Sequence, residues 1–246
     1  MQLNALIGQP VMNEIKGPIE FNDYDHYVRV EWDKFAGDPA RAGGSLAATA
    51  DMDVERVLDV GCGAGQELLP FVTEKGALGF GMDIAPTVGR VGREMFAAHA
   101  PSARVNFLRG GAEDLPFPAS FFDVVICRLV LPYTHNQRAF AEVSRVLRPG
   151  GKYLLKISGV RWYLLELKQA LKRGKVSSMI HATRVLVAGS AYHLTRRQPR
   201  WRIPSRETFQ SEWLLRHELR RHGLVIQGKT SDSNPVTPSF VIVKNE

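Results

Sequence analysis

The sequence predicts an α/β fold built on a doubly wound, mainly parallel sheet of seven strands. From residue 56 onward, short apolar runs rich in Val, Ile and Leu alternate with amphipathic segments. This alternation is typical of parallel strands that are connected by helices. In addition, a glycine-rich turn follows the first apolar run and leads into a helix, as at the start of many such sheets.

The N-terminal region predicts a helical cap. Between residues 23 and 35, aromatic and apolar residues recur at the spacing of one helix face: Tyr24, Tyr27, Val28, Trp32 and Phe35. The small and ring-constrained residues that follow, Gly37, Pro39 and the pair Gly43–Gly44, are expected to end helical structure. The first twenty residues are mixed in character and do not have the pattern of a secretory signal.

Seven apolar runs predict the strands of the sheet. They cover residues 56–60, 77–83, 104–109, 122–128, 152–157, 223–229 and 239–244. Helices are expected from about residue 66, over residues 86–99 and over residues 137–147, where a Pro-Gly-Gly sequence stops the last one. Four regions follow from this order, a cap, a core, an insertion and the last two strands: residues 1–50, 51–157, 158–222 and 223–246.

The predicted insertion, residues 158–222, is strongly basic and is expected to be mostly helical. It contains fourteen Lys and Arg against four Glu, an excess larger than the formal net charge of +7 of the whole chain. Three functional interpretations are compatible with this charge: a lid over an anionic small-molecule substrate, a surface for RNA or DNA, and a peripheral contact with an anionic membrane. A solvated basic face without a partner is the fourth.

Composition excludes some classes of protein. No apolar run reaches the eighteen or so residues of a membrane span. Only two cysteines occur, Cys62 and Cys127, both within apolar sequence, which predicts a reduced, cytoplasmic protein. There is no Cys/His cluster at metal-ligand spacing, so no metal site is predicted.

The chemistry of the chain is concentrated in VLDVGCGAGQE, residues 57–67. The predicted strand delivers Asp59, and Gly61, Gly63 and Gly65 follow before a helix begins. Glycines permit a tight turn and a close approach of ligand to backbone, and a helix N-terminus offers free N–H groups to a carboxylate. A ligand with an amino-acid head group suits both features. Gln66 stands where a nicotinamide fingerprint has its third glycine, and no Gly-Lys-Ser/Thr sequence follows as in a P-loop.

This stretch resembles motif I of the class I S-adenosylmethionine-dependent methyltransferases, an acid followed by G-x-G-x-G. Four further stretches match the same family in order: the strand ending at Asp83, GAEDLPFP, FDVVICRLVLPY and EVSRVLRPGGKYLLKI. The resemblance covers about residues 54–157, with residues 223–244 as the last two strands, and its closest branch includes the ubiquinone and menaquinone biosynthesis enzymes. It implies a Rossmann-like fold, S-adenosylmethionine as cofactor, and transfer of its methyl group to an O, N or C atom of a small molecule.

The resemblance also assigns roles to individual residues. Asp83 would bind the two ribose hydroxyls, with Ile84 beside it. Ala112 and Glu113 would frame the adenine, although Gly111 stands where this branch often carries an Asp. The full predicted cofactor site consists of Asp59, Gly61, Gly63, Gly65, Asp83, Ile84, Ala112, Glu113 and Arg128.

Residues near the acceptor are predicted from their position. Tyr133 and His135 follow the fourth strand, at the sheet edge where ligands of such folds bind, and His135 could accept a proton there. A loop or helix-capping role is the alternative for both. Tyr24 and Tyr27 are expected to line the acceptor pocket from the N-terminal helix, with packing on the core as the alternative.

Two other functions remain in competition with a small-molecule methyltransferase. The first is an RNA or DNA methyltransferase that uses the basic insertion. The fourth motif contains Cys127, Arg128 and Leu129 in place of the D/N/S-P-P-Y/F sequence of amino-methylating DNA enzymes, and this disfavours it. The second is a protein that binds S-adenosylmethionine without transferring its methyl group, which the departure at Gly111 keeps open.

Overall fold

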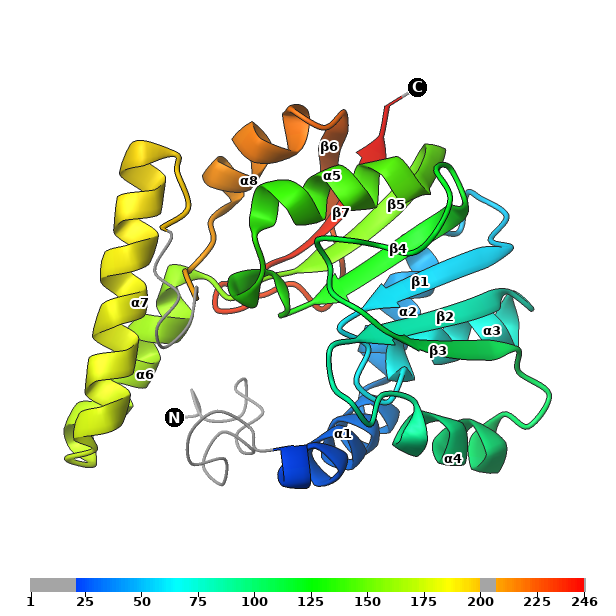
Figure 1. The fold of residues 1–246 in the computed structure, drawn as a ribbon, viewed down its shortest axis with the longest axis horizontal. Coiled ribbons are helices and arrows are strands. Elements are labelled where there is room, and N and C mark those ends of the chain that lie inside the picture. Colours follow the sequence, from blue (N-terminus) through cyan, green and yellow to red (C-terminus); the bar gives the residue numbers. More distant parts are fainter. Residues whose placement is uncertain (1–20, 200–206, 246) are drawn as a thin grey trace.

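The computed structural model describes residues 21–199 and 207–245 of the chain. Its centre is one seven-stranded sheet with the strand order β3-β2-β1-β4-β5-β7-β6 (Figure 1). The strands are β1 (Arg56–Val60), β2 (Leu78–Asp83), β3 (Val105–Arg109), β4 (Phe122–Arg128), β5 (Leu147–Lys156), β6 (Leu224–Lys229) and β7 (Ser239–Lys244).

The strand directions confirm the predicted doubly wound sheet. The pairs β2–β3, β1–β2, β1–β4 and β4–β5 are parallel, and only β7 runs against both of its neighbours, β5 and β6. The order reverses beside β1, because β2 and β3 lie on one side of it and β4 on the other. Ligands of such sheets bind at this switch point, beyond the carboxyl ends of the strands.

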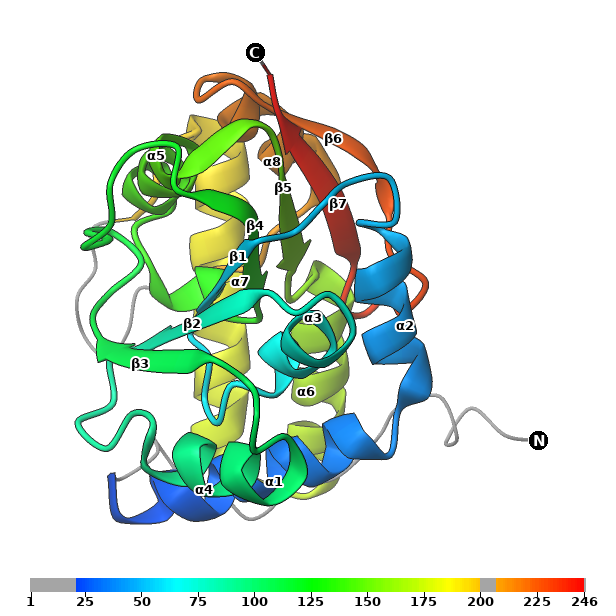
Figure 2. The same cartoon turned by 90° about the vertical axis from the view of Figure 1, so that its right-hand side faces the viewer.

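Helices cover both faces of the sheet (Figures 1 and 2). The helical elements are α1 (Phe21–Ala36), α2 (Pro39–Ala47), η2 (Gln66–Leu68), α3 (Leu69–Glu74), α4 (Arg90–His99), η3 (Leu131–Tyr133), α5 (Asn136–Val146), α6 (Val160–Lys172), α7 (Val176–Thr195) and α8 (Glu212–Arg220). No helix in the two described ranges is long and apolar enough to cross a membrane.

Alternation along β4 divides the core into two layers. Val125 and Cys127 belong to the apolar cluster that includes residues of α5 and α8. Val124 and Ile126 belong to the second cluster, which includes residues of α1, α3 and α4. Successive side chains of a strand point to opposite faces, so a strand that is buried on both faces is apolar throughout. This is why β4 is recognisable in the sequence.

The predicted insertion is mostly helical, as expected. Helices α6 and α7 form a hairpin that stands beyond the carboxyl edge of the sheet, on the left in Figure 1. Tyr163, Val185 and Phe209 form a separate small core within it. Helix α8 packs on the sheet instead, and its Leu215 and Leu219 enter the main core. Arg200 and Arg202, which the basic-segment prediction includes, lie outside the described residues.

Two predictions about local structure were wrong. Gly43 and Gly44 do not end a helix but lie inside α2, where a Cβ at Gly44 would meet Ser231 Oγ at 2.5 Å. Glycine there permits close approach to the β6–β7 loop, and this packing outweighs its low helix propensity. Helix α4 begins only at Arg90, after a turn in which Gly89 has φ +77°, rather than at residue 86.

Candidate functional site

The turn after β1, residues 61–65, lies at the carboxyl edge of the sheet. Gly61, Gly63 and Gly65 all have positive φ angles, of 74°, 55° and 81°. At Gly61 a Cβ would also lie 2.1 Å from Val130 Cγ2, so only glycine fits this position. The Gly61 N–H donates to the Met82 carbonyl at 2.7 Å, which fixes the turn against the end of β2.

Asp83 ends β2 and is held in place by backbone groups. Its Oδ2 accepts a hydrogen bond from the Gly63 N–H at 3.1 Å, and its Oδ1 accepts one from the Ala85 N–H at 3.0 Å. The Tyr24 hydroxyl of α1 is buried and has no hydrogen-bond partner within residues 21–199 and 207–245. Burial and the nearby Asp83 carboxylate raise the pKa of Tyr24. Asp83 is therefore fixed between the glycine turn and α1, with lone pairs left for a ligand.

Asp59 is a buried carboxylate beneath the same turn. Only 2 % of its surface is exposed, and its Oδ2 has no hydrogen-bond partner among the residues that the structure describes. Burial and the neighbouring Glu67 raise the pKa of Asp59 well above its usual value, against the opposing effect of Arg41 and Arg128. A buried carboxylate with an unpaired oxygen is costly and favours a cationic ligand.

These groups fit the cofactor that the sequence implies. The unpaired oxygen of Asp59 can accept from an amino group, and Asp83 can accept from two ribose hydroxyls. The glycine turn lies between them at the same sheet edge. The structure thus brings together the acids and glycines of the first two predicted motifs.

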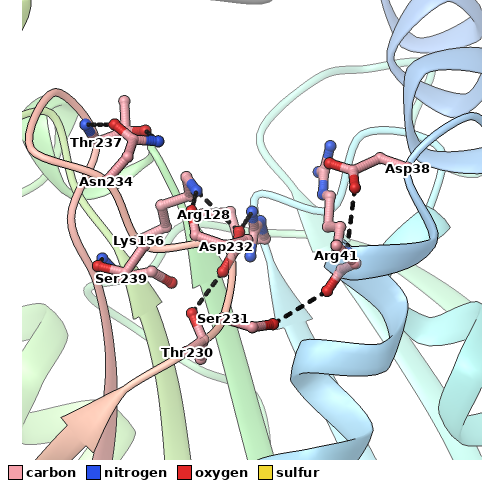
Figure 3. A network of polar contacts seen from close by, with 12 residues as sticks. Asp38, Arg41, Arg128, Lys156, Thr230, Ser231, Asp232, Asn234, Thr237 and Ser239 are labelled. Carbon is pink, nitrogen blue, oxygen red and sulfur yellow. Dashed lines mark hydrogen bonds and ion pairs between the residues drawn. The ribbon is translucent and has the colours of Figure 1, made fainter. Parts of the chain in front are cut away.

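A chain of charged groups connects the glycine-turn helix to the neighbouring strands (Figure 3). Glu67 of η2 accepts from Arg41 Nε at 2.6 Å, and its Oε1 lies 2.9 Å from Arg128 Nε at the end of β4. Arg128 also pairs with Asp232 of the β6–β7 loop. The Arg128 guanidinium thus has two carboxylate partners within the protein, so its predicted contact with the cofactor stays a prediction.

Asp232 extends this chain to β5. Lys156 Nζ donates to Asp232 Oδ2 at 2.8 Å. Burial alone would raise the pKa of Asp232, but Arg128 and Lys156 outweigh it and hold the pKa below its usual value. Figure 3 shows these side chains converging from α2, from the ends of β4 and β5, and from the β6–β7 loop. The network joins the N-terminal cap and the last two strands to the predicted cofactor edge.

The predicted adenine loop lies beside the start of α5. Ala112 is buried, and Glu113 Oε1 accepts a hydrogen bond from the His135 N–H at 2.8 Å. Glu113 thereby positions the N-terminus of α5. Ile84 follows Asp83 and is 68 % exposed, as expected of an apolar residue that a ligand could cover.

The residues predicted to lie near the acceptor are found in two parts of the structure, at the cofactor edge and beside the α6–α7 hairpin. Tyr27 lies on α1 near the cofactor edge, and burial together with Glu31 raises its pKa to about 12, with a smaller contribution from Asp83. His135 is the N-cap of α5, and its buried Nδ1 has no partner in the described part of the chain. Tyr133, in contrast, faces the α6–α7 hairpin, where burial and the Glu207 carboxylate raise its pKa.

A cluster of polar side chains, which we call the lid cluster, surrounds Glu207. Tyr163 of α6 donates its hydroxyl to Glu207 Oε1 at 2.9 Å, and His181 Nε2 of α7 lies 3.4 Å from Glu207 Oε2. Arg184 Nη2 lies 4.0 Å from the same oxygen. The hairpin therefore directs a hydroxyl and an imidazole toward the Glu207 carboxylate, near Tyr133.

Glu166 completes the lid cluster from α6. Its Oε1 lies 4.0 Å from His181 Nε2, and its buried Oε2 has no hydrogen-bond partner within the described ranges. Burial raises the pKa of Glu166, and Glu207 raises it further, although His181 opposes this. The sequence does not indicate Glu166 or Glu207 as site residues, because neither belongs to a motif. They are also distant from each other and from Tyr133 in the sequence.

Comparison with known proteins agrees with this geometry. Residues 58–155 match the model of a family described as a methyltransferase domain. The chain is 36 % identical over 99 residues to a sterol 4-C-methyltransferase of Caenorhabditis elegans, covering 40 % of this chain and 29 % of that protein. Over 103 residues it is 36 % identical to a ubiquinone/menaquinone biosynthesis C-methyltransferase of Stutzerimonas stutzeri, covering 41 % and 40 %.

A fatty-acid O-methyltransferase of Mycolicibacterium smegmatis is 36 % identical over 132 residues, covering 52 % of this chain and 46 % of that protein. The chain thus spans about half or less of the length of these curated relatives.

Solved structures extend the fold similarity beyond the matched domain. The magnesium protoporphyrin IX methyltransferase of Synechocystis with bound SAH has a TM-score of 0.58 at 20 % identity, covering 94 % of this chain and 90 % of that one. An O-methyltransferase family protein of Burkholderia thailandensis has a TM-score of 0.58 at 16 % identity, covering 91 % and 58 %. At these identities the likeness shows the fold.

Proposed function

We propose that this chain, which carries a class I S-adenosylmethionine-dependent methyltransferase domain, transfers a methyl group from that cofactor to an O, N or C atom of a small molecule. The observation that carries the proposal is the hydrogen bond from the Gly63 N–H to the Asp83 carboxylate, beside the unpaired oxygen of Asp59. This arrangement offers acceptors for a diol and for an amino group on one side of a glycine turn.

Different residues at the carboxyl edge of the sheet would bind different parts of the cofactor. Asp83 would bind the ribose hydroxyls, Asp59 the amino group, and Ala112 with Glu113 the adenine. The bound cofactor supplies an already activated methyl group on its sulfonium. The protein then has to align the acceptor with that methyl and exclude water, so the proposal requires no strong catalytic base.

The acceptor would lie between the sheet edge and the hairpin, beside Tyr27, Tyr133 and the lid cluster. Three relatives are named for sterol, quinone or fatty-acid methylation, which supports a small, largely apolar acceptor for this chain. The Glu166 and Glu207 carboxylates favour an acceptor that donates a hydrogen bond. The net charge of the insertion alone is compatible with an anionic acceptor.

The same proposal includes a reducing, cytoplasmic location. Cys62 and Cys127 are both buried and unbonded. Burial also raises the pKa of each thiol, so neither is activated as a nucleophile. Cys127 is therefore a packed core residue in the proposal.

Thermal unfolding with added ligands tests the proposed cofactor. A ligand that binds the native state at 100 times its Kd stabilises it by about 2.7 kcal/mol. We expect S-adenosylmethionine and S-adenosylhomocysteine to raise the melting temperature and NADH to leave it unchanged. A shift with NADH alone would overturn the proposal. Stabilisation by S-adenosylmethionine, with no transfer to any sterol, quinone, fatty acid or RNA tested, would favour a binding protein without transferase activity.

A further inference from the structure

The connection between α6 and α7 forms an exposed basic tip, which we define as residues 168–180. Its four cations, Lys168, Lys172, Arg173 and Lys175, are all exposed, and this segment contains no Asp or Glu. Figure 1 shows the tip at the lower end of the hairpin, away from the sheet. The tip therefore presents concentrated positive charge to its surroundings.

Three apolar side chains share this exposed tip. Leu171 is 58 % exposed, Val176 is 63 % exposed and Ile180 is 64 % exposed. Leu171 is the penultimate residue of α6 and Val176 is the first residue of α7, so apolar and basic residues lie together around the connection. Single exposed apolar residues are ordinary, but three beside four cations form a combined surface.

The tip has a strong excess of positive charge, although Glu166 of α6 lies within electrostatic range of Lys175. Lys175 is the N-cap of α7, and the first turn of this helix contains no acidic residue. A helix N-terminus already carries partial positive charge, so Lys175 is electrostatically unfavourable there, whereas Lys172 at the end of α6 lies where a cation is favourable. Lys168, Lys172 and Lys175 form no ion pair with any residue of the described part of the chain. An anionic partner would relieve this repulsion.

We propose that this tip docks on the surface of an anionic phospholipid bilayer. Cations attract the anionic head groups, and Leu171, Val176 and Ile180 can enter the boundary between head groups and acyl chains. Both features are needed for such a contact, and both lie on the same segment. Single-stranded nucleic acid is bound through aromatic stacking as well as charge, and residues 168–180 contain no aromatic side chain.

Docking at the tip would orient the rest of the hairpin. Helices α6 and α7 run side by side away from the tip in both views. Tyr163 and His181 of these helices form part of that cluster. A membrane-bound tip would therefore bring the lid toward the bilayer. The surface contact itself is independent of methyl transfer and is tested without it.

Vesicle flotation of the full chain tests the proposal. The probes are vesicles of phosphatidylcholine alone and of phosphatidylcholine mixed with phosphatidylglycerol. We expect binding to the mixed vesicles to be at least about tenfold stronger, since each Lys or Arg near an anionic surface contributes about one decade or slightly less. Raising the salt concentration should weaken this binding.

Two pairs of substitutions separate the two features of the tip. Lys172→Glu with Lys175→Glu should weaken binding to the mixed vesicles by about tenfold or more. Leu171→Ser with Val176→Ser should also weaken it, because the charge remains but the apolar contact is lost. The charge control is Lys75→Glu with Arg220→Glu, which changes two exposed residues at the ends of α3 and α8. The apolar control is Leu194→Ser, at the other end of α7. Both controls should bind as the unaltered protein does.

All variants should retain S-adenosylmethionine binding and the melting temperature, which shows that they are folded. Equal flotation with both kinds of vesicle would overturn the proposal. So would tip variants that bind like the unaltered chain, or charge controls that lose binding to the same extent. If the tip retains a single-stranded RNA oligonucleotide but no vesicle, it is a nucleic-acid surface and the proposal is wrong.

Discussion

The cofactor edge and the lid cluster both present buried acids, but the chain assembles them in different ways. At the edge, Asp59 is the penultimate residue of β1 and Asp83 the last residue of the parallel β2, and the glycine turn that follows β1 is one short stretch of sequence. In the lid cluster, Tyr163, His181 and Glu207 come from three separate segments, α6, α7 and the chain before α8. Local backbone geometry therefore determines the first site, and only the tertiary fold determines the second.

The largest expected effect falls on the glycine turn. Gly63 has φ +55°, and a Cβ there would lie 3.3 Å from Val28 Cγ1 of α1. Gly63→Val should therefore displace both the turn and the N–H that donates to Asp83. Strain of roughly 1–2 kcal/mol and the lost charged hydrogen bond together predict about a hundredfold weaker S-adenosylmethionine binding by calorimetry.

Gly76→Val is the matched control for this variant. Gly76 has φ +65°, and nothing lies within 4 Å of a Cβ added there. The control should lose stability of roughly 1–2 kcal/mol for the same backbone reason and keep its cofactor affinity. Equal cofactor affinity in the two Val variants would mean that Gly63 is a turn residue without a role in the site.

The next effect is expected at Asp83. Asp83→Ala removes the acceptor of the Gly63 and Ala85 N–H groups and the proposed acceptor for the ribose hydroxyls. Hydrogen bonds to charged groups contribute about 1.5–3 kcal/mol, so affinity for S-adenosylmethionine should fall at least about tenfold. Calorimetry on the folded variant measures this, with exposed Asp53→Ala as the control. Unchanged affinity would refute the assignment of Asp83.

Much of the fold could be predicted because its strands are buried on both faces. β1, β4 and β7 have the boundaries that were predicted, and β2, β3 and β6 differ only at their first residue. The predictions failed where tertiary contacts override local preference. Gly44 lies inside a helix, close to Ser231, and β5 begins at Leu147 rather than at the predicted residue 152, because Leu147 pairs with Phe122 of β4.

The candidate site, like the fold, was predictable where it depends on sequence motifs and not where it depends on tertiary contacts. The motif residues Asp59, Gly63 and Asp83 gather at one edge, because their strands are adjacent and parallel. No pattern in the sequence indicated that Arg128 would pair with Glu67 and Asp232. Such pairs depend on the placement of a distant loop, which local sequence does not encode.

A smaller effect, with a distinctive pH dependence, is expected at Asp59. Its raised pKa means that the folded chain binds this proton more tightly than the unfolded chain. The free energy of unfolding should therefore fall as pH rises from about 3.9, the unfolded value, through the raised folded value. Asp59→Asn removes this loss, so without ligand the variant should gain stability relative to the unaltered protein across that window.

Urea unfolding over a pH series measures this difference, with exposed Asp53→Asn as the control. The same Asp59→Asn variant should bind S-adenosylmethionine about tenfold more weakly, because a charged hydrogen bond to the amino group is lost. A variant that is less stable than the unaltered protein throughout the window would show that the Asp59 carboxylate is satisfied in the folded chain. It would then not be a ligand for a cation.

The smallest effect on cofactor affinity is expected from the arginines of the insertion. Their replacement tests whether the cofactor edge and the insertion are separate in function. Replacing Arg196, Arg197, Arg200 and Arg202 with Gln should leave S-adenosylmethionine affinity within about twofold, since within residues 21–199 and 207–245 no ion pair joins Arg196 to the sheet edge. Its guanidinium lies 5.4 Å from the centre of the Trp213 ring, a contact of about 0.5–1 kcal/mol.

The melting temperature of the variant should therefore be only slightly lower than that of the unaltered protein. Its affinity for an anionic acceptor should decrease if these cations face the substrate. Affinities for cofactor and acceptor, measured on one preparation, separate the outcomes. Loss of cofactor binding in a folded variant would join the insertion to the cofactor edge and remove the distinction between the regions. If neither affinity changes, these arginines form a solvated basic surface. The insertion would then contact the acceptor through the lid cluster alone.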